Sequence, residues 1–206
     1  MKTSRAISEL GFAEIIKYID TQAITDSTER IRFIFKFLEA VGLRSMELLN
    51  ARLEHFQDEE EGLILFVNGK GNSNRYVFIP NQAQEALNRY LAYRDISIDK
   101  DAKKPLIASL IDSNEPLGYQ AFYQHVKSWI DRAISESDLT SKEKSRLALA
   151  SPHWLRHTFG TRAVSRNVPM DAIQAQMGHA SIKTTMDIYG RAPIKRRAIE
   201  IGKAFK

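Results

Sequence analysis

The sequence contains no cysteine among its 206 residues. Disulfide bonds, thiolate metal sites and cysteine nucleophiles are therefore excluded, and the redox compartment is left open. Long apolar runs are also missing: no segment approaches the roughly 18 residues of a membrane span, and the N-terminus lacks the hydrophobic stretch of a signal peptide. We therefore expect a cytoplasmic protein that has no membrane partner.

Motifs for nucleotide or metal chemistry are missing as well. The sequence has no P-loop and no carboxylate cluster with metal-ligand spacing. His153 and His157 have the spacing of two zinc-binding histidines, but a metalloprotease helix requires Glu after the first His, where this chain has Trp154. We therefore expect neither a cofactor nor a metal ion.

The composition is that of a globular protein, with 43% hydrophobic and 27% charged residues. A chain of this length can form one good core or two small ones. Lys and Arg number 30 against 25 Asp and Glu, which gives a formal net charge of +5. This excess slightly favours a polyanionic partner, although many basic proteins bind no nucleic acid.

Hydrophobic spacing predicts a mixed α+β fold that is mostly α-helical, with a small antiparallel β-sheet. An acidic run at 59–61 indicates a solvated turn, and the charged connection at 135–150 is either an additional helix or a mobile loop. The predicted helices cover 6–20, the segment from the N-caps at 26–28 to Gly42, 82–94 and 118–134, and the predicted strands cover 63–67 and 75–79.

A dense polar cluster follows Ser151. A helix there would place His153, Arg156 and His157 on one face, because residues three and four positions apart are neighbours on a helix surface. Asn167 tolerates the left-handed conformation that ends a helix. This segment therefore predicts a helix that presents two imidazoles and a guanidinium on the same side.

The chain beyond Asn167 predicts two further helices. Pro169 suits the first turn of the first of them, and Gly178 suits its end, which leaves His179 just outside. Ser181 is a suitable N-cap for the next helix, which carries Tyr189. The whole segment can therefore bring two His, an Arg and a Tyr hydroxyl to one place.

These residue types suit one kind of chemistry. A tyrosine can be a covalent nucleophile, and an arginine can bind two phosphate oxygens with its planar fork. Together, and without a carboxylate pair or a thiol, they indicate attack of a phenol oxygen on a phosphodiester. Taken singly, each of these residues is more simply explained as an ordinary helix residue, and Tyr189 as a half-buried aromatic.

The combination resembles a known family. The letters HWLRHT at 153–158, MGHASIKTT at 177–185 and the following Tyr189 resemble the C-terminal motifs of the tyrosine recombinases, also called the phage integrase family. The order of the motifs, the three-residue step from His153 to Arg156 and the ten-residue step from His179 to Tyr189 all agree with that family.

Two segments nearer the N-terminus carry the same resemblance. The letters GLRSMEL at 42–48 resemble the family's first arginine motif, which implies that Arg44 binds phosphate and that Glu47 supports it. Without the resemblance, Arg44 would be interpreted as a solvated surface residue, and Lys70 as an inert lysine at a hairpin tip. The Gly-Lys-Gly hairpin resembles the family's lysine hairpin, which implies that Lys70 protonates the leaving 5′ oxygen.

The resemblance implies roles for the C-terminal residues too. Tyr189 would attack a DNA phosphate and form a 3′-phosphotyrosyl bond, and Arg156 would join Arg44 in binding the non-bridging oxygens. His153 would be the general base, and His179 would donate a hydrogen bond to the phosphate. His157 would be a structural, supporting residue. Such a reaction needs neither ATP nor a metal.

The resemblance covers roughly 6–189, so residues 1–206 are expected to be a catalytic domain that lacks the family's separate N-terminal core-binding domain. Its partner would be double-stranded DNA, with self-association into a tetramer on DNA and a monomer in its absence. An apolar stripe predicts an amphipathic helix at 194–205. That helix either folds back on its own domain or, as the family implies, docks on a neighbouring protomer.

The leading hypothesis is a site-specific DNA recombinase or integrase. A non-cutting DNA-binding protein of the same fold is a second hypothesis, which the presence of Arg44, Lys70, Arg156 and Tyr189 argues against. A third is a type IB topoisomerase-like activity, which would use the same chemistry to relax DNA without joining new partners.

Overall fold

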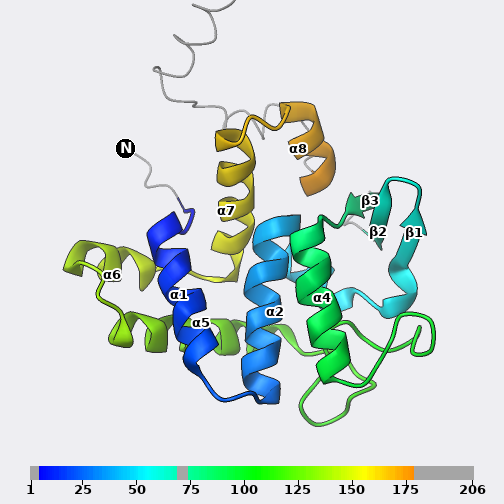
Figure 1. Ribbon diagram of the computed structural model, residues 1–206, viewed down its shortest axis with the longest axis horizontal. Helices are drawn as coiled ribbons and strands as arrows, with labels where there is room; N and C mark the ends of the chain where they lie inside the picture. Colours follow the sequence, from blue (N-terminus) through cyan, green and yellow to red (C-terminus); the bar gives the residue numbers. More distant parts are fainter. Residues whose placement is uncertain (1–4, 69–73, 179–206) are drawn as a thin grey trace, which may run out of the picture.

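The structure is a computed structural model that describes residues 5–68 and 74–178 (Figure 1). The described elements are, in chain order, α1 Glu9–Thr21, α2 Asp26–Val41, α3 Ser45–Asn50, a 3₁₀ turn at Leu53–His55, β1 Phe56–Glu59, β2 Gly62–Val67, β3 Arg75–Phe78, α4 Asn81–Tyr93, α5 Tyr119–Glu136, α6 Ser141–Leu147, α7 Pro152–Ser165 and α8 Met170–Met177. The mostly helical α+β architecture is thus confirmed. None of the described helices is long and apolar enough to span a bilayer.

The sheet has three antiparallel strands in the order β1-β2-β3. The predicted hairpin is confirmed: β2 pairs with β3, and Val67 lies opposite Arg75. β1 was not predicted, because Phe56 is its single apolar residue and its other side chains are exposed. Pairing with β2 makes this segment a strand. The acidic run at 59–61, predicted as a turn, therefore begins with Glu59 at the end of β1, and only residues 60–61 form the turn.

The core is built around α2, which packs against α1, α4 and α7 (Figure 1). Phe33, Phe35 and Phe37 of α2 are all fully buried. Phe33 and Phe37 lie on one side of the helix, with ring centroids 4.8 Å apart, and Phe35 lies on another side, against Phe12 of α1. Burying one such ring stabilises the fold by roughly 1.5–3 kcal/mol. A helix that is buried on most of its sides belongs in the centre of a domain, and α2 therefore holds the surrounding elements in place.

Local signals set most helix ends, with shifts of a few residues. α1 begins later than predicted, because the Ser8 side chain accepts a hydrogen bond from the Gly11 N–H. α2 is capped by Thr25, one residue before the predicted caps. Gly42 ends α2 as predicted with φ 74°, and a Cβ there would lie 2.4 Å from the Phe159 ring. A glycine is therefore required at this point, for its conformation and for its lack of a side chain.

The C-terminal helices agree closely with the sequence. α7 ends before Asn167, whose φ of 67° is left-handed as predicted, and α8 ends at Gly178 with φ 64°. Pro169 is the N-cap of α8 and not a residue of its first turn. The connection at 135–150 contains the additional helix, α6, which Thr140 caps.

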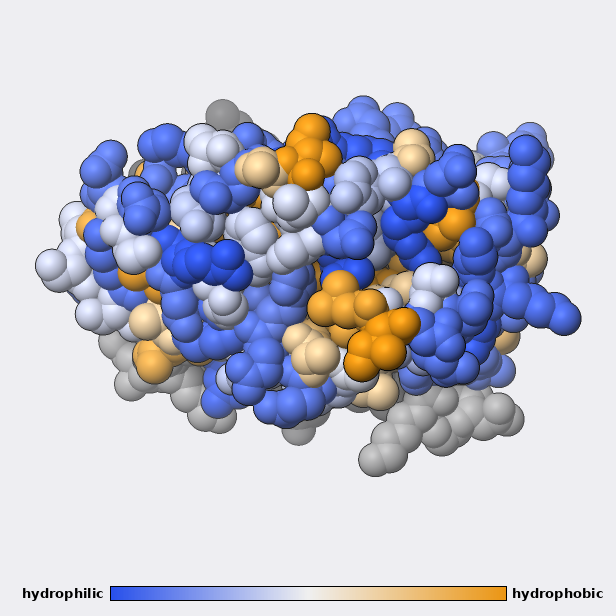
Figure 2. Space-filling view, turned by 90° about the horizontal axis from the view of Figure 1, so that it is seen from below, coloured by the Kyte–Doolittle hydropathy of each residue, from blue (hydrophilic) through white to orange (hydrophobic). Residues whose placement is uncertain are grey.

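Hydrophilic residues form most of the surface at the end of the molecule opposite α8, with hydrophobic residues in small patches between them (Figure 2). The polar cluster predicted from the sequence lies on α7, which packs against α2 and α8, and α8 in turn packs against β3 (Figure 1).

Candidate active site

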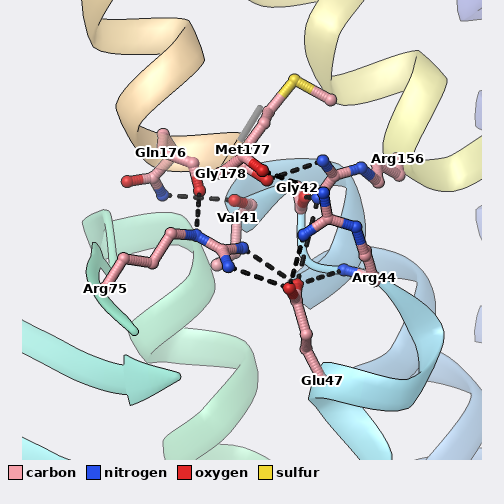
Figure 3. A network of polar contacts seen from close by, with 9 residues as sticks. All are labelled: Val41, Gly42, Arg44, Glu47, Arg75, Arg156, Gln176, Met177 and Gly178. Atoms are coloured by element: carbon pink, nitrogen blue, oxygen red, sulfur yellow. Dashed lines mark hydrogen bonds and ion pairs between the residues drawn. The ribbon is translucent and has the colours of Figure 1, made fainter. Parts of the chain in front are cut away.

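Side chains and backbone carbonyls from five segments meet beside the C-terminal end of α8 (Figure 3). The residues of this network are Val41 and Gly42 at the end of α2, Arg44 and Glu47 at the start of α3, Arg75 at the start of β3, Arg156 in α7, and Gln176, Met177 and Gly178 at the end of α8.

The Glu47 carboxylate is the centre of the network. Arg44 donates its backbone N–H to Glu47 Oε2 and its Nη1 to Oε1, each at 2.7 Å. Arg75 donates Nη1 to Oε1 at 2.8 Å and Nη2 to Oε2 at 2.9 Å, which is a two-pronged contact. The Arg156 guanidinium lies 4.0 Å from Oε2. Three arginines therefore surround one carboxylate.

Glu47 stays ionised despite its burial. Burial by itself raises the pKa of a carboxyl, but the hydrogen bonds from Arg75 and from the Arg44 backbone, together with the charge of Arg75, outweigh it. The pKa of Glu47 is thus lowered from its usual 4.5 to about 2. At neutral pH the site holds a fixed negative charge that orients the guanidiniums around it.

The start of α3 explains why Arg44 and Glu47 are neighbours. Arg44 is the N-cap residue, and Ser45 is the first residue of the helix. Glu47 occupies the third helical position and reaches back to the N-cap N–H, which is one half of a capping box. The carboxylate also lies at the positive end of the helix dipole, where a negative charge is favoured.

The three arginines also bind three successive carbonyls at the end of α8 (Figure 3). Arg75 Nε donates to the carbonyl of Gln176 at 3.2 Å, Arg156 Nη2 to that of Met177 at 2.6 Å, and Arg44 Nη2 to that of Gly178 at 2.9 Å. The last carbonyls of a helix have no partner within it and carry its negative dipole end. The arginines supply both hydrogen-bond donors and positive charge to these carbonyls, and they fix the position of the C-terminal end of α8.

His153 and His157 lie on the same side of α7, with ring centroids 4.5 Å apart and planes nearly perpendicular. His153 is exposed and His157 is half-buried. Partial desolvation lowers the pKa of His153, and the positive charges of Arg156, Arg5 and Arg44 lower it further. Its imidazole is therefore neutral at pH 7 and able to accept a proton.

Arg75 was not among the residues singled out from the sequence. The alternation of β3 contained a signal for it, because Arg75 is on the same face as Val77 and Ile79, which are both fully buried. A charged residue on the buried face of a strand requires an acidic partner. The identity of that partner, Glu47, depends on tertiary structure and is not readable from the local pattern.

Gln176 was missed as well. Its side-chain amide accepts a hydrogen bond from the Phe78 N–H at 3.1 Å and donates to the Phe78 carbonyl at 2.8 Å. The same Nε2 also donates to the carbonyl of Val41 at 3.2 Å. The amide thus takes the place of a neighbouring strand on the open edge of β3 and fastens α8 to the sheet and to α2.

Three of the predicted site residues, Lys70, His179 and Tyr189, lie outside the described residues, as does the predicted helix at 194–205. The structure describes Arg75, five positions after Lys70, and Gly178, directly before His179. The structure thus brings together Arg44, Glu47 and Arg156, with the His pair on the same helix as Arg156. Within 5–68 and 74–178, no group of three or more His, Asp or Glu residues could hold a metal ion.

A family comparison agrees with this geometry. The model of the phage integrase family matches residues 9–195. The chain belongs to the phage integrase family. The match includes every residue of the network and all of the motifs on which the resemblance was based.

Curated relatives of this integrase-family chain carry the name tyrosine recombinase. One is XerC of Lactobacillus delbrueckii subsp. bulgaricus, 29% identical over 86% of this chain and 56% of the relative. Another is XerA of Thermococcus onnurineus, 30% identical over 84% of this chain and 54% of the relative. The chain therefore spans about half the length of the curated relatives it matches.

A solved structure with the same fold is that of the Tn1549 transposon integrase in complex with circular intermediate DNA. It superimposes with a TM-score of 0.74 over 99% of this chain and 68% of that one, with 16% identity. At this identity the likeness establishes the integrase fold of the chain and nothing more specific.

Proposed function

We propose that this chain is the catalytic part of a site-specific DNA recombinase, which breaks and rejoins double-stranded DNA through a 3′-phosphotyrosyl intermediate. Membership of the phage integrase family supports the reaction class, and so do the curated relatives, which are tyrosine recombinases. The Tn1549 integrase, which shares the fold, was solved with DNA, and this supports DNA as the substrate.

The observation that carries the proposal is the meeting of Arg44 and Arg156 at one ionised carboxylate. Arg44 exposes 43% of its side chain, which leaves it accessible to a ligand, whereas Arg156 exposes 4% and is fixed by the carbonyls of Gly42 and Met177. Preorganised guanidiniums suit the non-bridging oxygens of a phosphodiester, where charge builds up in the transition state. Such donors are typically worth about 3 kcal/mol each.

In the proposed reaction the phenol oxygen of Tyr189 forms a bond to the DNA phosphorus, and the bond from phosphorus to the 5′ oxygen breaks. His153 accepts the phenol proton, for which its lowered pKa suits it, and Lys70 donates a proton to the leaving oxygen. One phosphodiester replaces another, so rejoining needs no external energy source. We assign His179 to a hydrogen bond with the phosphate and His157 to the support of His153.

We further propose that residues 1–206 form the catalytic domain, that the protein assembles as a tetramer on DNA, and that it acts in the cytoplasm. The fold similarity along 99% of the chain supports a single catalytic domain. Tetramer formation is open to measurement by light scattering with and without DNA.

A covalent-capture experiment tests the proposal. The chain is incubated with a library of nicked duplexes of random sequence in the presence of EDTA, and covalent protein–DNA adducts are isolated on a denaturing gel and sequenced. The nick lets the cleaved strand diffuse away, so the adduct accumulates. We expect an adduct on a restricted set of sequences, formed without a metal ion.

Tyr189→Phe is expected to abolish the adduct, because it removes the attacking oxygen and little else. Tyr119→Phe is the matched control, since Tyr119 is a 48% exposed tyrosine of α5, and it should leave the adduct unchanged. DNA binding without an adduct would overturn the proposal in favour of a non-cutting protein. Relaxation of supercoiled plasmids that lack the captured sequences would instead favour the topoisomerase-like activity.

A further inference from the structure

Arg75 joins three separate segments of the network. Its side chain is 11% exposed and makes three hydrogen bonds, two to Glu47 and one to the carbonyl of Gln176. It therefore connects β3, which follows the Gly-Lys-Gly hairpin in sequence, with α3, which carries Glu47, and with the end of α8 (Figure 3).

The contact between Arg75 and Glu47 determines how the carboxylate is turned. The two prongs of Arg75 occupy one lone pair on each oxygen, so that the plane of the carboxylate is fixed. Arg44 Nη1 then shares Oε1, at 2.7 Å. Because Arg44 is 43% exposed, its orientation depends on these few polar contacts and not on tight packing.

The end of α8 is shaped to admit the Arg75 guanidinium. Gly178 has φ 64°, and a Cβ there would lie 2.8 Å from Cζ, Nε and Nη1 of Arg75. Van der Waals contact requires more than that distance, so the guanidinium occupies space that any other residue type would fill. The close approach places Arg75 against the backbone directly before His179.

We propose that Arg75 is a positioning residue of the candidate active site: its two-pronged contact fixes the Glu47 carboxylate that orients Arg44, and its Nε anchors the end of α8 beside them. This inference rests on the proposed DNA-cleavage reaction. Arg75 acts through Glu47 and α8, and it does not itself bind the DNA phosphate.

The test compares substitutions of two arginines, each of which donates two hydrogen bonds to a buried glutamate. Arg89 of α4 donates Nε and Nη2 to Glu29 at 2.7 and 2.9 Å, and Glu29 keeps Arg32 as a second partner, as Glu47 keeps Arg44. Arg89→Gln is therefore the matched control for Arg75→Gln. Arg89 is more exposed, 52% against 11%, so the melting temperature of each variant is measured alongside.

The first readout is the single-turnover rate of adduct formation on a captured DNA, with DNA affinity measured separately. We expect Arg75→Gln to slow adduct formation about 10- to 100-fold at saturating DNA, because a small misplacement of a catalytic group has an effect of that size. DNA affinity should change by less than about threefold, and Arg89→Gln should keep the full rate. Equal slowing by both variants would overturn the proposal.

The pH dependence separates positioning from a general loss of stability. Arg75 is the main group that lowers the pKa of Glu47, which Arg44 and Arg156 also face. In Arg75→Gln the pKa of Glu47 rises, so this variant should lose additional rate as the pH is lowered, relative to the unmodified chain at each pH. Arg75→Lys, which keeps the charge but not the fork, should restore the pH behaviour and only part of the rate.

A second readout does not depend on cleavage. In nitrogen-15 NMR of the protein without DNA, a held guanidinium gives separate Nη signals that a freely rotating one does not. We expect the separate signals of Arg44 to disappear in Arg75→Gln and to persist in Arg89→Gln. If they persist in Arg75→Gln, the positioning role is wrong. If they disappear but no DNA gives a Tyr189-dependent adduct, the positioning role stands and the proposed function fails.

Discussion

At the scale of single residues, Glu47 shows how a buried charge is maintained. An isolated carboxylate in a protein interior would take up a proton, because burial disfavours the charged form. Glu47 keeps its charge because the two prongs of Arg75 and the N–H groups of Arg44 satisfy both oxygens. Removing one partner therefore leaves the others with an unmatched charge.

The pKa of Glu47 predicts how its contribution to stability depends on pH. A folded-state pKa of about 2, below the usual 4.5, stabilises the protein above about pH 4.5, and this contribution is lost as the pH falls toward 2. At roughly 1.4 kcal/mol for each pKa unit, the contribution at neutral pH is on the order of 3 kcal/mol.

Glu47→Gln should therefore lower the free energy of unfolding at pH 7 by about 3 kcal/mol, and by progressively less as the pH falls below about 4.5. Urea denaturation of both proteins across this pH range measures the difference. Glu85→Gln, which changes an exposed glutamate of α4, is the control and should change stability by less than about 0.5 kcal/mol. A Glu47→Gln deficit that is independent of pH would contradict the ionised state assigned here.

At the scale of elements, α8 depends on how it ends. It has eight residues, too few to be stable alone, and its last carbonyls are bound by three arginines while Gln176 fastens it to β3. Gly178 makes this ending possible, because its φ of 64° turns the chain and its missing side chain leaves room for Arg75.

Gly178→Ser should therefore destabilise the protein by about 1–3 kcal/mol, since it adds backbone strain and a close contact with Arg75. Adduct formation should slow by more than the loss of folded protein explains. Gly118→Ser is the matched control: Gly118 is the N-cap of α5 with φ −66°, and a Cβ there has open space around it. Thermal unfolding and adduct rates of both variants test this, and equal effects would contradict it.

The sequence predicted elements that have their own local signals. Apolar spacing and end residues such as Gly42, Asn167 and Gly178 predicted the long helices and most of their ends. β1 was missed because only Phe56 marks it, and its strand conformation comes from pairing with β2.

The candidate site, like the fold, was predictable only where a local motif marks its residues. Arg44, Glu47 and Arg156 were identified by motif, and the structure brings them together. Arg75 and Gln176 were missed because their partners are 28 and 98 or more positions away in sequence. Contacts of this kind arise only when the chain has folded, and no local pattern encodes them.

At the scale of the whole molecule, the charge distribution matters more than its sum. A formal net charge of +5 on 206 residues is modest, and acidic residues are almost as numerous as basic ones. Affinity for DNA should therefore come from cations gathered on one surface, of which Arg44 is the exposed member of the described network. Each phosphate contact releases counterions, so the dependence of DNA affinity on salt concentration reports how many such contacts form.

Arg44→Gln should therefore reduce the slope of log affinity against log salt concentration by about 1, and should weaken binding to all DNA sequences alike. Fluorescence anisotropy with a labelled duplex at several salt concentrations measures the slope. Arg132→Gln is the control: it removes the same charge from α5, which lies at the end of the molecule away from α8 (Figure 1), where Arg132 stacks over the Trp129 ring. If overall charge governed DNA binding, both variants would change the slope equally, whereas a local phosphate contact requires the change in Arg44→Gln alone.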